Sequence, residues 1–260
     1  MLPKTRSGCP DRSRNSRFEP NSRTIYTEHA NRLIEQATPD AFFESTMAEV
    51  QGNQRRTSRM DEIVLKSMAK WPNVPNVFGW LGLDRRGNWV IKDQRIGNPH
   101  VIEFICRNYN VDEQGRWYFQ NGPQRVFVSL AYAPFVLRTC KSGEAACLQT
   151  HTGVVLETIT GAWIDEDGTL VLRWSNAELG SVSDRDLAEV TTWFTNAAGQ
   201  PADDDTVTRA VESRAAHGST GIWLSYRSSR LPIGRVMSEQ LPRKFGFDRS
   251  PEPAPGQPDC

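Results

Sequence analysis

Apolar and polar residues alternate along several short runs of the chain, and each run follows the same four-residue turn. The turns have the pattern D-x-x-G, at Asp84–Gly87, Asp112–Gly115 and Asp165–Gly168. An aspartate at the first position can bind the backbone two residues on, and glycine at the last accepts a positive φ. The alternating apolar residues that follow the turns are Trp89, Ile91, Trp117, Phe119, Leu170, Leu172 and Trp174. The pattern therefore predicts three strand–turn–strand units.

Helical spacing of apolar residues follows the first and the third of these units. Residues 101–109 follow Asn98-Pro99, and Asn98 suits the N-cap while Pro99 suits the first helical position. Residues 187–194 follow Ser183, for which we predict the N-cap, with Asp186 three residues on as in a capping box. The sequence therefore predicts a helix after each of the two hairpins.

These two hairpin–helix units suggest that the chain contains an internal duplication. They lie roughly 80 residues apart, and each precedes a further segment with strand character, at 124–138 and at 221–236. The alternative is that D-x-x-G hairpins are common and that the likeness is coincidental. We expect an α+β fold of two similar subdomains, each made of short antiparallel strands with a packed helix.

The composition changes at both ends of this repeated region. We expect residues 1–59 to form an extension that is largely disordered, with two weak helices between positions 27 and 50 that Pro39 divides. One hypothesis is that the native protein begins at Met60. We expect the two subdomains at 60–150 and 151–245, and a disordered, proline-rich tail at 246–260.

The net charge and the cysteines indicate which binding partners and which cellular compartment to expect. Lys plus Arg and Asp plus Glu each number 31, so the net charge gives no reason to expect binding to nucleic acid or to an anionic membrane. The five cysteines are scattered, which favours reduced thiols over a disulfide framework. No signal peptide is recognisable, and the apolar run 126–137 is too short to span a membrane. We expect a soluble, cytoplasmic protein.

The stretch from Gly79 to Leu137 resembles a bacterial family of unknown function. It contains, in order, G-W-L, D-R-R-G-N-W, I-G-N-P-H, F-I-C-R-N-Y, D-x-x-G-R-W-Y-F, G-P-Q-R-V-F-V and A-P-F-V-L. The resemblance implies an α+β fold of two similar subdomains and a role in ligand binding or signal transduction. It implies no catalytic residue. Where the family has Thr-Pro before the closing strand, this chain has Asn121-Gly122-Pro123.

The run RWYFQNGPQRVFV, residues 116–128, combines large aromatic side chains with arginines and amides, the composition of recognition surfaces. In a strand, Arg116, Tyr118 and Gln120 share one face, with Arg125 across the turn, and the other face points to the core. The first face could line a groove. The alternative is a polar outer sheet face with a cross-strand pair between Tyr118 and Arg125.

The end of the first predicted helix lies close in sequence to this run. Arg107 and Asn108 suit a helix C-terminus on electrostatic and conformational grounds alone, and they could also face the same groove. An arginine there would suit a carboxylate or a phosphate on a small ligand. The candidate ligand-binding residues are Arg107, Asn108, Arg116, Tyr118, Gln124 and Arg125.

Other kinds of site have less support. Cys140, Cys147 and His151 have the spacing C-x6-C-x3-H, but no fourth ligand stands nearby, so we predict no metal and no cofactor. Arginines interleaved with aromatic residues also suggest single-stranded nucleic acid, which the balancing acidic residues disfavour. Known nucleophile and phosphate-binding motifs are missing. We expect a binding or regulatory module for a small anionic ligand, with a protein partner as a further possibility. The alternatives are an enzyme of undetected type acting on a small anionic metabolite and a nucleic-acid-associated accessory protein.

Overall fold

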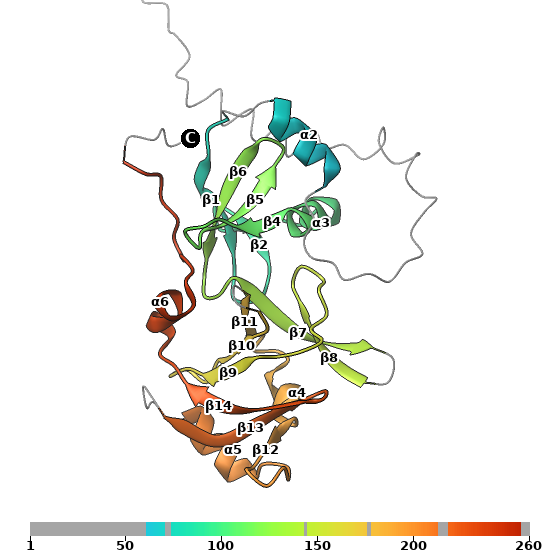
Figure 1. The fold of residues 1–260 in the computed structure, drawn as a ribbon, viewed down its shortest axis with the longest axis vertical. Coiled ribbons are helices and arrows are strands. Elements are labelled where there is room, and N and C mark those ends of the chain that lie inside the picture. Colours follow the sequence, from blue (N-terminus) through green and yellow to red (C-terminus); the bar gives the residue numbers. More distant parts are fainter. Residues whose placement is uncertain (1–60, 71–73, 143–144, 176–177, 213–217, 256–260) are drawn as a thin grey trace, which may run out of the picture. The chain divides into compact units, whose positions relative to one another are not determined.

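The computed structural model describes residues 61–70, 74–142, 145–175, 178–212 and 218–255. The helices expected between positions 27 and 50 lie outside these residues. None of the helices in this part of the chain has the length and apolar character to cross a membrane. The described part contains two β-sheets and several short helices (Figure 1).

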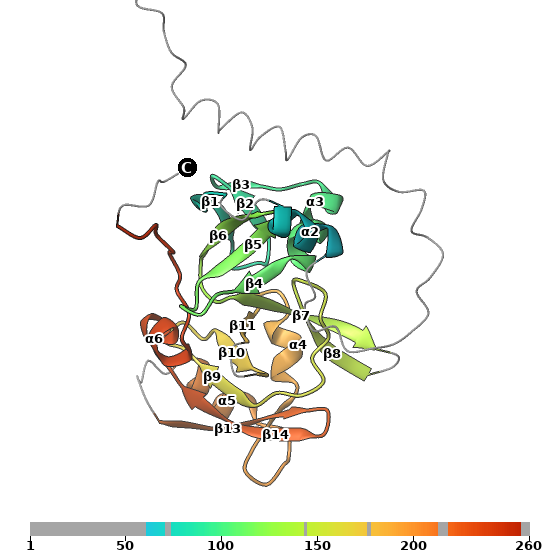
Figure 2. The same ribbon diagram turned by 45° about the horizontal axis from the view of Figure 1, so that its top comes forward.

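The first sheet has six strands, all from the amino-terminal half of the described chain. In spatial order they are β3 (Gln94–Arg95), β2 (Trp89–Ile91), β1 (Val77–Leu83), β6 (Gln124–Leu130), β5 (Trp117–Asn121) and β4 (Tyr109–Val111). Neighbours pair antiparallel except β1 and β6, which are parallel. The short edge strand β3 can be followed in Figure 2.

The second sheet has eight strands. In spatial order they are β12 (Phe194–Thr195), β13 (Ser219–Tyr226), β14 (Ser229–Arg235), β9 (Gly161–Ile164), β10 (Leu170–Arg173), β11 (Leu179–Val182), β7 (Phe135–Ser142) and β8 (Ala145–Thr150). The pairs β9–β14 and β7–β11 are parallel. The segment 124–138 has the predicted strand character, but it forms two strands, β6 and β7, which lie on either side of residues 131–134 and join different sheets.

Six strands of the second sheet repeat the topology of the first sheet, so the chain is built of two similar subdomains, and β7 and β8 extend the second sheet. Strands β3-β2-β1-β6-β5-β4 correspond in order to β11-β10-β9-β14-β13-β12, and every pairing keeps its direction. The helices also occupy equivalent places along the chain. Helix α3 (Pro99–Arg107) lies between β3 and β4, and helix α4 (Leu187–Thr191) lies between β11 and β12. We call 77–130 the first repeat and 161–235 the second repeat. The predicted duplication is confirmed.

The D-x-x-G turn occurs at equivalent positions of both repeats, and the structure contains one turn of this kind that the sequence pattern missed. In the second repeat Asn196 replaces the aspartate, and its Oδ1 accepts from Ala198 and Gln200 at 2.9 and 3.1 Å. Asp112 Oδ1 binds Gln114 and Arg116 in the same way, at 3.0 and 2.9 Å. The glycine that ends each turn has a φ near +80°, which a residue with a Cβ rarely adopts. These four are Gly87, Gly115, Gly168 and Gly199.

The helices begin as predicted in the first repeat but differently in the second. Asn98 caps α3 by accepting from His100 at 3.0 Å, with Pro99 at the first position. In α4 the N-cap is Asp186 rather than Ser183, and its side chain makes no cap bond. Both helices end earlier than predicted, because Tyr109 and Phe194 already pair in strands β4 and β12.

Two further helices flank these. Helix α2 (Glu62–Lys70) precedes the first repeat, and helix α5 (Asp204–Glu212) is an insertion between β12 and β13. Ala210 on α5 is buried in the core of the second sheet. The core on the first sheet includes Trp89, Trp117 and Val128, and it continues to Val171 and Leu179 of the second sheet. One shared apolar cluster therefore joins the two repeats.

The segment after the second repeat is ordered, where we had expected a tail from residue 246. The 3-10 helix η2 (Ser238–Gln240) and helix α6 (Leu241–Phe245) lead into residues that reach the first repeat. Phe247 is 7% exposed, and the Asp248 N–H donates to Gly115 O at 3.0 Å. The composition did not reveal this, because backbone hydrogen bonds and the contacts of single side chains such as Phe247 hold the segment, and neither depends on a high apolar content.

Candidate functional site

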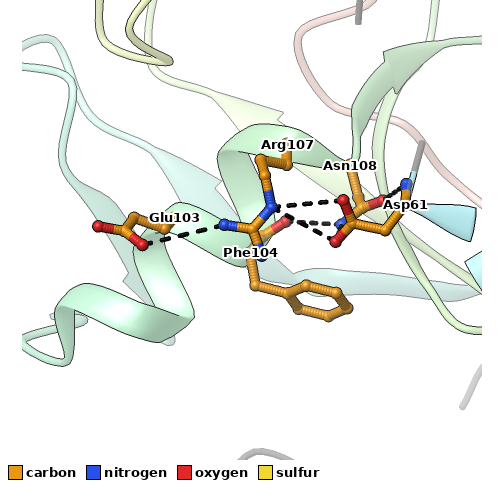
Figure 3. A network of polar contacts seen from close by, with 5 residues as sticks. All are labelled: Asp61, Glu103, Phe104, Arg107 and Asn108. Carbon is orange, nitrogen blue, oxygen red and sulfur yellow. Dashed lines mark hydrogen bonds and ion pairs between the residues drawn. The ribbon is translucent and has the colours of Figure 1, made fainter. Parts of the chain in front are cut away.

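Arg107 and Asn108 belong to a polar network around Asp61 (Figure 3). Asn108 is fully buried, and its Nδ2 donates to Asp61 Oδ2 at 3.2 Å and to Phe104 O at 3.0 Å. Its Oδ1 accepts from the Asp61 N–H at 3.0 Å. Arg107 Nε lies 3.4 Å from both Asp61 carboxylate oxygens, and its Nη1 lies 3.9 Å from Glu103. The network holds the start of α2 against the end of α3 and uses the hydrogen-bonding capacity of Asn108.

Arg116, Tyr118 and Arg125 lie together on the other face of the first sheet. Phe127 is stacked on Phe78 with ring centroids 4.5 Å apart, and it contacts the Tyr118 ring at 5.8 Å. Arg116 Cζ lies 4.6 Å from the centroid of Phe127, and Arg125 Cζ lies 4.6 Å from that of Tyr118. The three rings are almost completely buried, so only the arginines can meet a ligand.

The alternation of strand β5 agrees with the prediction, whereas the predicted cross-strand pair does not. Trp117 and Phe119 point into the core, away from Tyr118. Tyr118 pairs directly with Phe127, and Arg125 pairs with Gln120, so Arg125 reaches Tyr118 on the diagonal. The register differs by two residues from the expected one, because the two-residue turn is made by Gly122 and Pro123.

The predicted residues differ in how many of their polar groups are already used. Arg116 forms an ion pair with Asp112 at 2.8 Å, through both Nε and Nη2. Gln124 lies on the opposite face from Arg125 and donates to Pro75 O at 3.0 Å. The guanidinium of Arg125 has no hydrogen bond or ion pair with any residue the structure describes. Of the three candidate arginines, Arg125 is thus the one whose guanidinium makes no ion pair or hydrogen bond within the described part of the chain.

The second repeat contains the same arrangement at the equivalent positions. Arg230 pairs with Ser225 and lies over the diagonal Trp223, with its Cζ 4.7 Å from the ring centroid. In contrast to Arg125, its guanidinium donates to Asn196 O and lies 3.4 Å from Thr195 Oγ1. Both repeats therefore place an arginine over an aromatic ring, and they differ in whether its donors are used within the chain.

A second cluster, which we did not predict, surrounds Tyr132 between the repeats. The Tyr132 hydroxyl donates to Asp165 Oδ2 at 2.5 Å, and Asp165 is fully buried. Burial raises the pKa of Tyr132, and the hydrogen bond to Asp165 and the charge of Asp165 raise it further. Arg85 and Arg249 both lie over the Tyr132 ring. The sequence signal for this cluster was weak, because Asp165 looked like an ordinary turn residue and Arg249 lay in the expected tail.

His151 lies in a cage of aromatic rings between β7 and the first repeat. Its ring centroid is 5.2 Å from Trp89, 5.8 Å from Tyr109 and 5.7 Å from Phe135. Nδ1 accepts from the Val136 N–H at 3.3 Å, so Nε2 carries the proton, and this buried atom has no hydrogen-bond partner among the described residues. Burial lowers the pKa of His151 to about 3, against a smaller opposite effect of Asp84.

The neighbouring thiol does not make His151 part of a nucleophilic pair. Cys106 Sγ accepts from Trp89 Nε1 at 3.3 Å and lies 3.7 Å from the backbone oxygen of His151. Burial raises the pKa of the Cys106 thiol, despite opposing effects of Trp89 and Arg107. A thiolate is the reactive form of cysteine, so this environment does not activate Cys106.

The expectation of reduced thiols is wrong for Cys140 and Cys147. They are directly opposite in the β7–β8 hairpin, with Cα atoms 5.0 Å apart, and they form a disulfide. Cysteines that face each other across two strands are within disulfide range, which their spacing in sequence does not reveal. In this state the pair cannot supply the thiolates of the C-x6-C-x3-H zinc site that we weighed.

Residues 60–252 match the family DUF2944, described as "Protein of unknown function (DUF2946)", and the chain belongs to this family. No curated protein matches the chain. The chain is similar to a crystal structure of a DUF1285 family protein from Silicibacter pomeroyi DSS-3, with 15% identity and a TM-score of 0.42 over 72% of this chain and 92% of the other. A DUF1285 family protein from Shewanella baltica OS155 gives 10% identity and a TM-score of 0.32 over 40% and 84%.

Proposed function

We propose that the protein is a binding module for a small anionic ligand, and that Arg125 holds the anionic group. The proposal is supported by the position of its guanidinium over Tyr118, at 4.6 Å, with no partner among the described residues. Stacking on a ring restricts a guanidinium to one orientation and leaves its N–H donors available at the edge. A carboxylate or phosphate could accept two of these donors at once.

The comparison between the repeats is the observation that carries this proposal. Arg125 and Arg230 occupy equivalent positions over Tyr118 and Trp223. Arg230 is hydrogen-bonded within its own repeat, to Asn196 O. The first repeat keeps the stacking but lacks the internal acceptor, and this is the difference expected if Arg125 serves a ligand.

The remaining predicted residues have other roles in this proposal. Tyr118 orients Arg125, and Arg116 adds positive charge on the same face although it is paired with Asp112. Arg107, Asn108 and Gln124 are assigned to contacts that stabilise the fold. Binding without turnover would fit a regulatory or signalling module, whereas conversion of the ligand by purified protein would indicate an enzyme.

A thermal-shift screen against small carboxylates, phosphate esters and nucleotides tests the proposal. The variants are Arg125→Ala and, as a matched control, Arg230→Ala, which removes an arginine from the same kind of contact in the other repeat. A ligand should raise the melting temperature of the native protein and of Arg230→Ala, and fail to raise that of Arg125→Ala. If no anion stabilises the native protein, or if Arg125→Ala responds equally to every anion that does, the proposal is wrong.

A further inference from the structure

Two guanidinium groups lie against the buried ring of Tyr132, at the junction of the repeats. Arg85 Cζ lies 4.5 Å from the ring centroid and Arg249 Cζ lies 5.2 Å from it. Arg85 comes from the Asp84–Gly87 turn of the first repeat, whereas Arg249 comes from the segment after α6. Tyr132 is only 2% exposed, so the two guanidiniums rather than the ring face solvent.

Neither guanidinium forms an ion pair with a carboxylate of the described residues. Arg249 donates from Nε to Tyr132 O at 2.9 Å and from Nη2 to Ser238 O at 2.8 Å, and both acceptors are uncharged carbonyls. Arg85 is exposed and forms no ion pair with the residues described. Burial lowers the pKa of Arg249 and the charge of Arg85 lowers it further, against opposite effects of Tyr132 and the nearby acidic residues. An anion between the two would reduce their repulsion.

The two carboxylates whose charge acts on Arg249, those of Asp165 and Glu166, accept hydrogen bonds from other groups. Asp165 Oδ2 accepts from the Tyr132 hydroxyl, and its Oδ1 accepts from the Thr169 N–H at 2.7 Å. Glu166 accepts from the Ser238 N–H at 2.8 Å and from the Ser238 hydroxyl. Burial would raise the pKa of Glu166, but the hydrogen bonds from Ser238 outweigh this and lower it. Both carboxylates are therefore fixed by local donors.

The comparison of the two repeats shows that the positive charge of the Asp84–Gly87 turn is specific to the first repeat. The turn residues Arg85 and Arg86 correspond to Glu166 and Asp167 in the second repeat. Arg86 joins the repeats through an ion pair with Asp184 at 3.5 Å. Arg85 lies in the same turn but has no such partner among the residues that the structure describes.

We propose that Arg85 and Arg249 together bind a doubly charged oxyanion, either free inorganic phosphate or the phosphate group of a small monoester. Guanidinium groups match phosphate oxygens with paired N–H donors, and they lose little hydration on binding. The bound anion contacts the first repeat and the C-terminal segment at once. An anion that binds only the folded state raises the free energy of unfolding, and the increase grows with the logarithm of the anion concentration.

The test is a phosphate titration of the full chain, followed by thermal unfolding at constant ionic strength set with chloride. The native protein should gain melting temperature with inorganic phosphate and should gain less with acetate, which carries one charge. Arg85→Ala should bind phosphate at least about tenfold more weakly, since it loses one charged partner. Arg95→Ala is the matched control, because Arg95 is an exposed arginine of the same repeat and has no contact with Tyr132.

Two further arms complete the experiment. Glycerol phosphate replaces inorganic phosphate, and tighter binding of one of the two identifies which source of the group the site prefers. Arg249→Lys keeps the charge but loses the paired donors, and it should also weaken binding. Equal phosphate affinity in Arg85→Ala and Arg95→Ala, or no effect of phosphate beyond that of chloride, overturns the proposal. Arg125→Ala should bind phosphate normally here, which separates this site from the one proposed above.

Discussion

Mild acid should destabilise the protein through His151. The imidazole is enclosed by Trp89, Tyr109 and Phe135, and burial holds its pKa at about 3, compared with 6.5 in the unfolded chain. Between these values the unfolded state binds a proton that the folded state does not. The free energy of unfolding therefore falls as the pH decreases below about 6.5, by about 1.4 kcal/mol per pH unit.

The size of the effect follows from this difference. At pH 5 the loss is about 2 kcal/mol relative to pH 7, and at pH 3 it is about 4 kcal/mol. These figures are upper values, because His151 as a whole residue is only half-buried although its Nε2 is enclosed. Ordinary carboxyl groups titrate near pH 4, so the window from pH 6.5 to 5 isolates the histidine.

Urea unfolding at pH 7, 6 and 5, followed by tryptophan fluorescence, measures the effect. His151→Phe keeps an aromatic ring in the cage and removes the titrating group, so its unfolding free energy should change about 2 kcal/mol less than that of the native protein over this range. If the unfolding free energies of the native protein and of His151→Phe change equally with pH, the reasoning is refuted. That result would show that the ring is not held neutral by the fold.

Three further substitutions test separate features by chemical denaturation. Asn108→Ala removes the amide that joins α2 to α3 and leaves buried donors and acceptors without partners, so we expect a loss of about 1–3 kcal/mol; an unchanged midpoint would mean that α2 contributes nothing. Lys92 and Asp93 have φ values of 47° and 66° in the turn between β2 and β3, and replacing them by Asn-Gly should stabilise the protein by about 1 kcal/mol; a loss would show that Lys92 over the Trp80 ring matters more. Cys140→Ser with Cys147→Ser opens a closed loop with a sequence separation of 7 and should cost about 2–3 kcal/mol, which a reducing agent should reproduce in the native protein but not in the variant.

The repeated fold could be predicted from the sequence because it rests on local signals. An aspartate and a glycine fix each turn, and Asn98 with Pro99 fixes the start of α3. The fourth turn was missed because its first residue is Asn196 and not an aspartate, although the Asn196 Oδ1 accepts the same backbone hydrogen bonds. Ser183 was chosen as a cap because sequence spacing cannot show which residue first adopts helical geometry.

The site depended on contacts between distant residues, which no local pattern encodes. Arg107 and Asn108 are close in sequence to β5, yet Asp61 draws both into a different network. The partners of Tyr132 come from positions 85, 165 and 249. The disulfide likewise required the register of β7 against β8.

The segment that follows α6 has a practical consequence for work with this protein. Its backbone passes so close to Gly115 that a Cβ there would lie 2.1 Å from Gly246 O, and the Leu130 N–H donates to Arg249 O at 2.8 Å. The last strand of the first repeat is thus completed by residues translated after the second repeat. A stop codon placed before residue 246 would remove these contacts, so the first repeat expressed without residues 246–249 should be less stable than it is in the full chain.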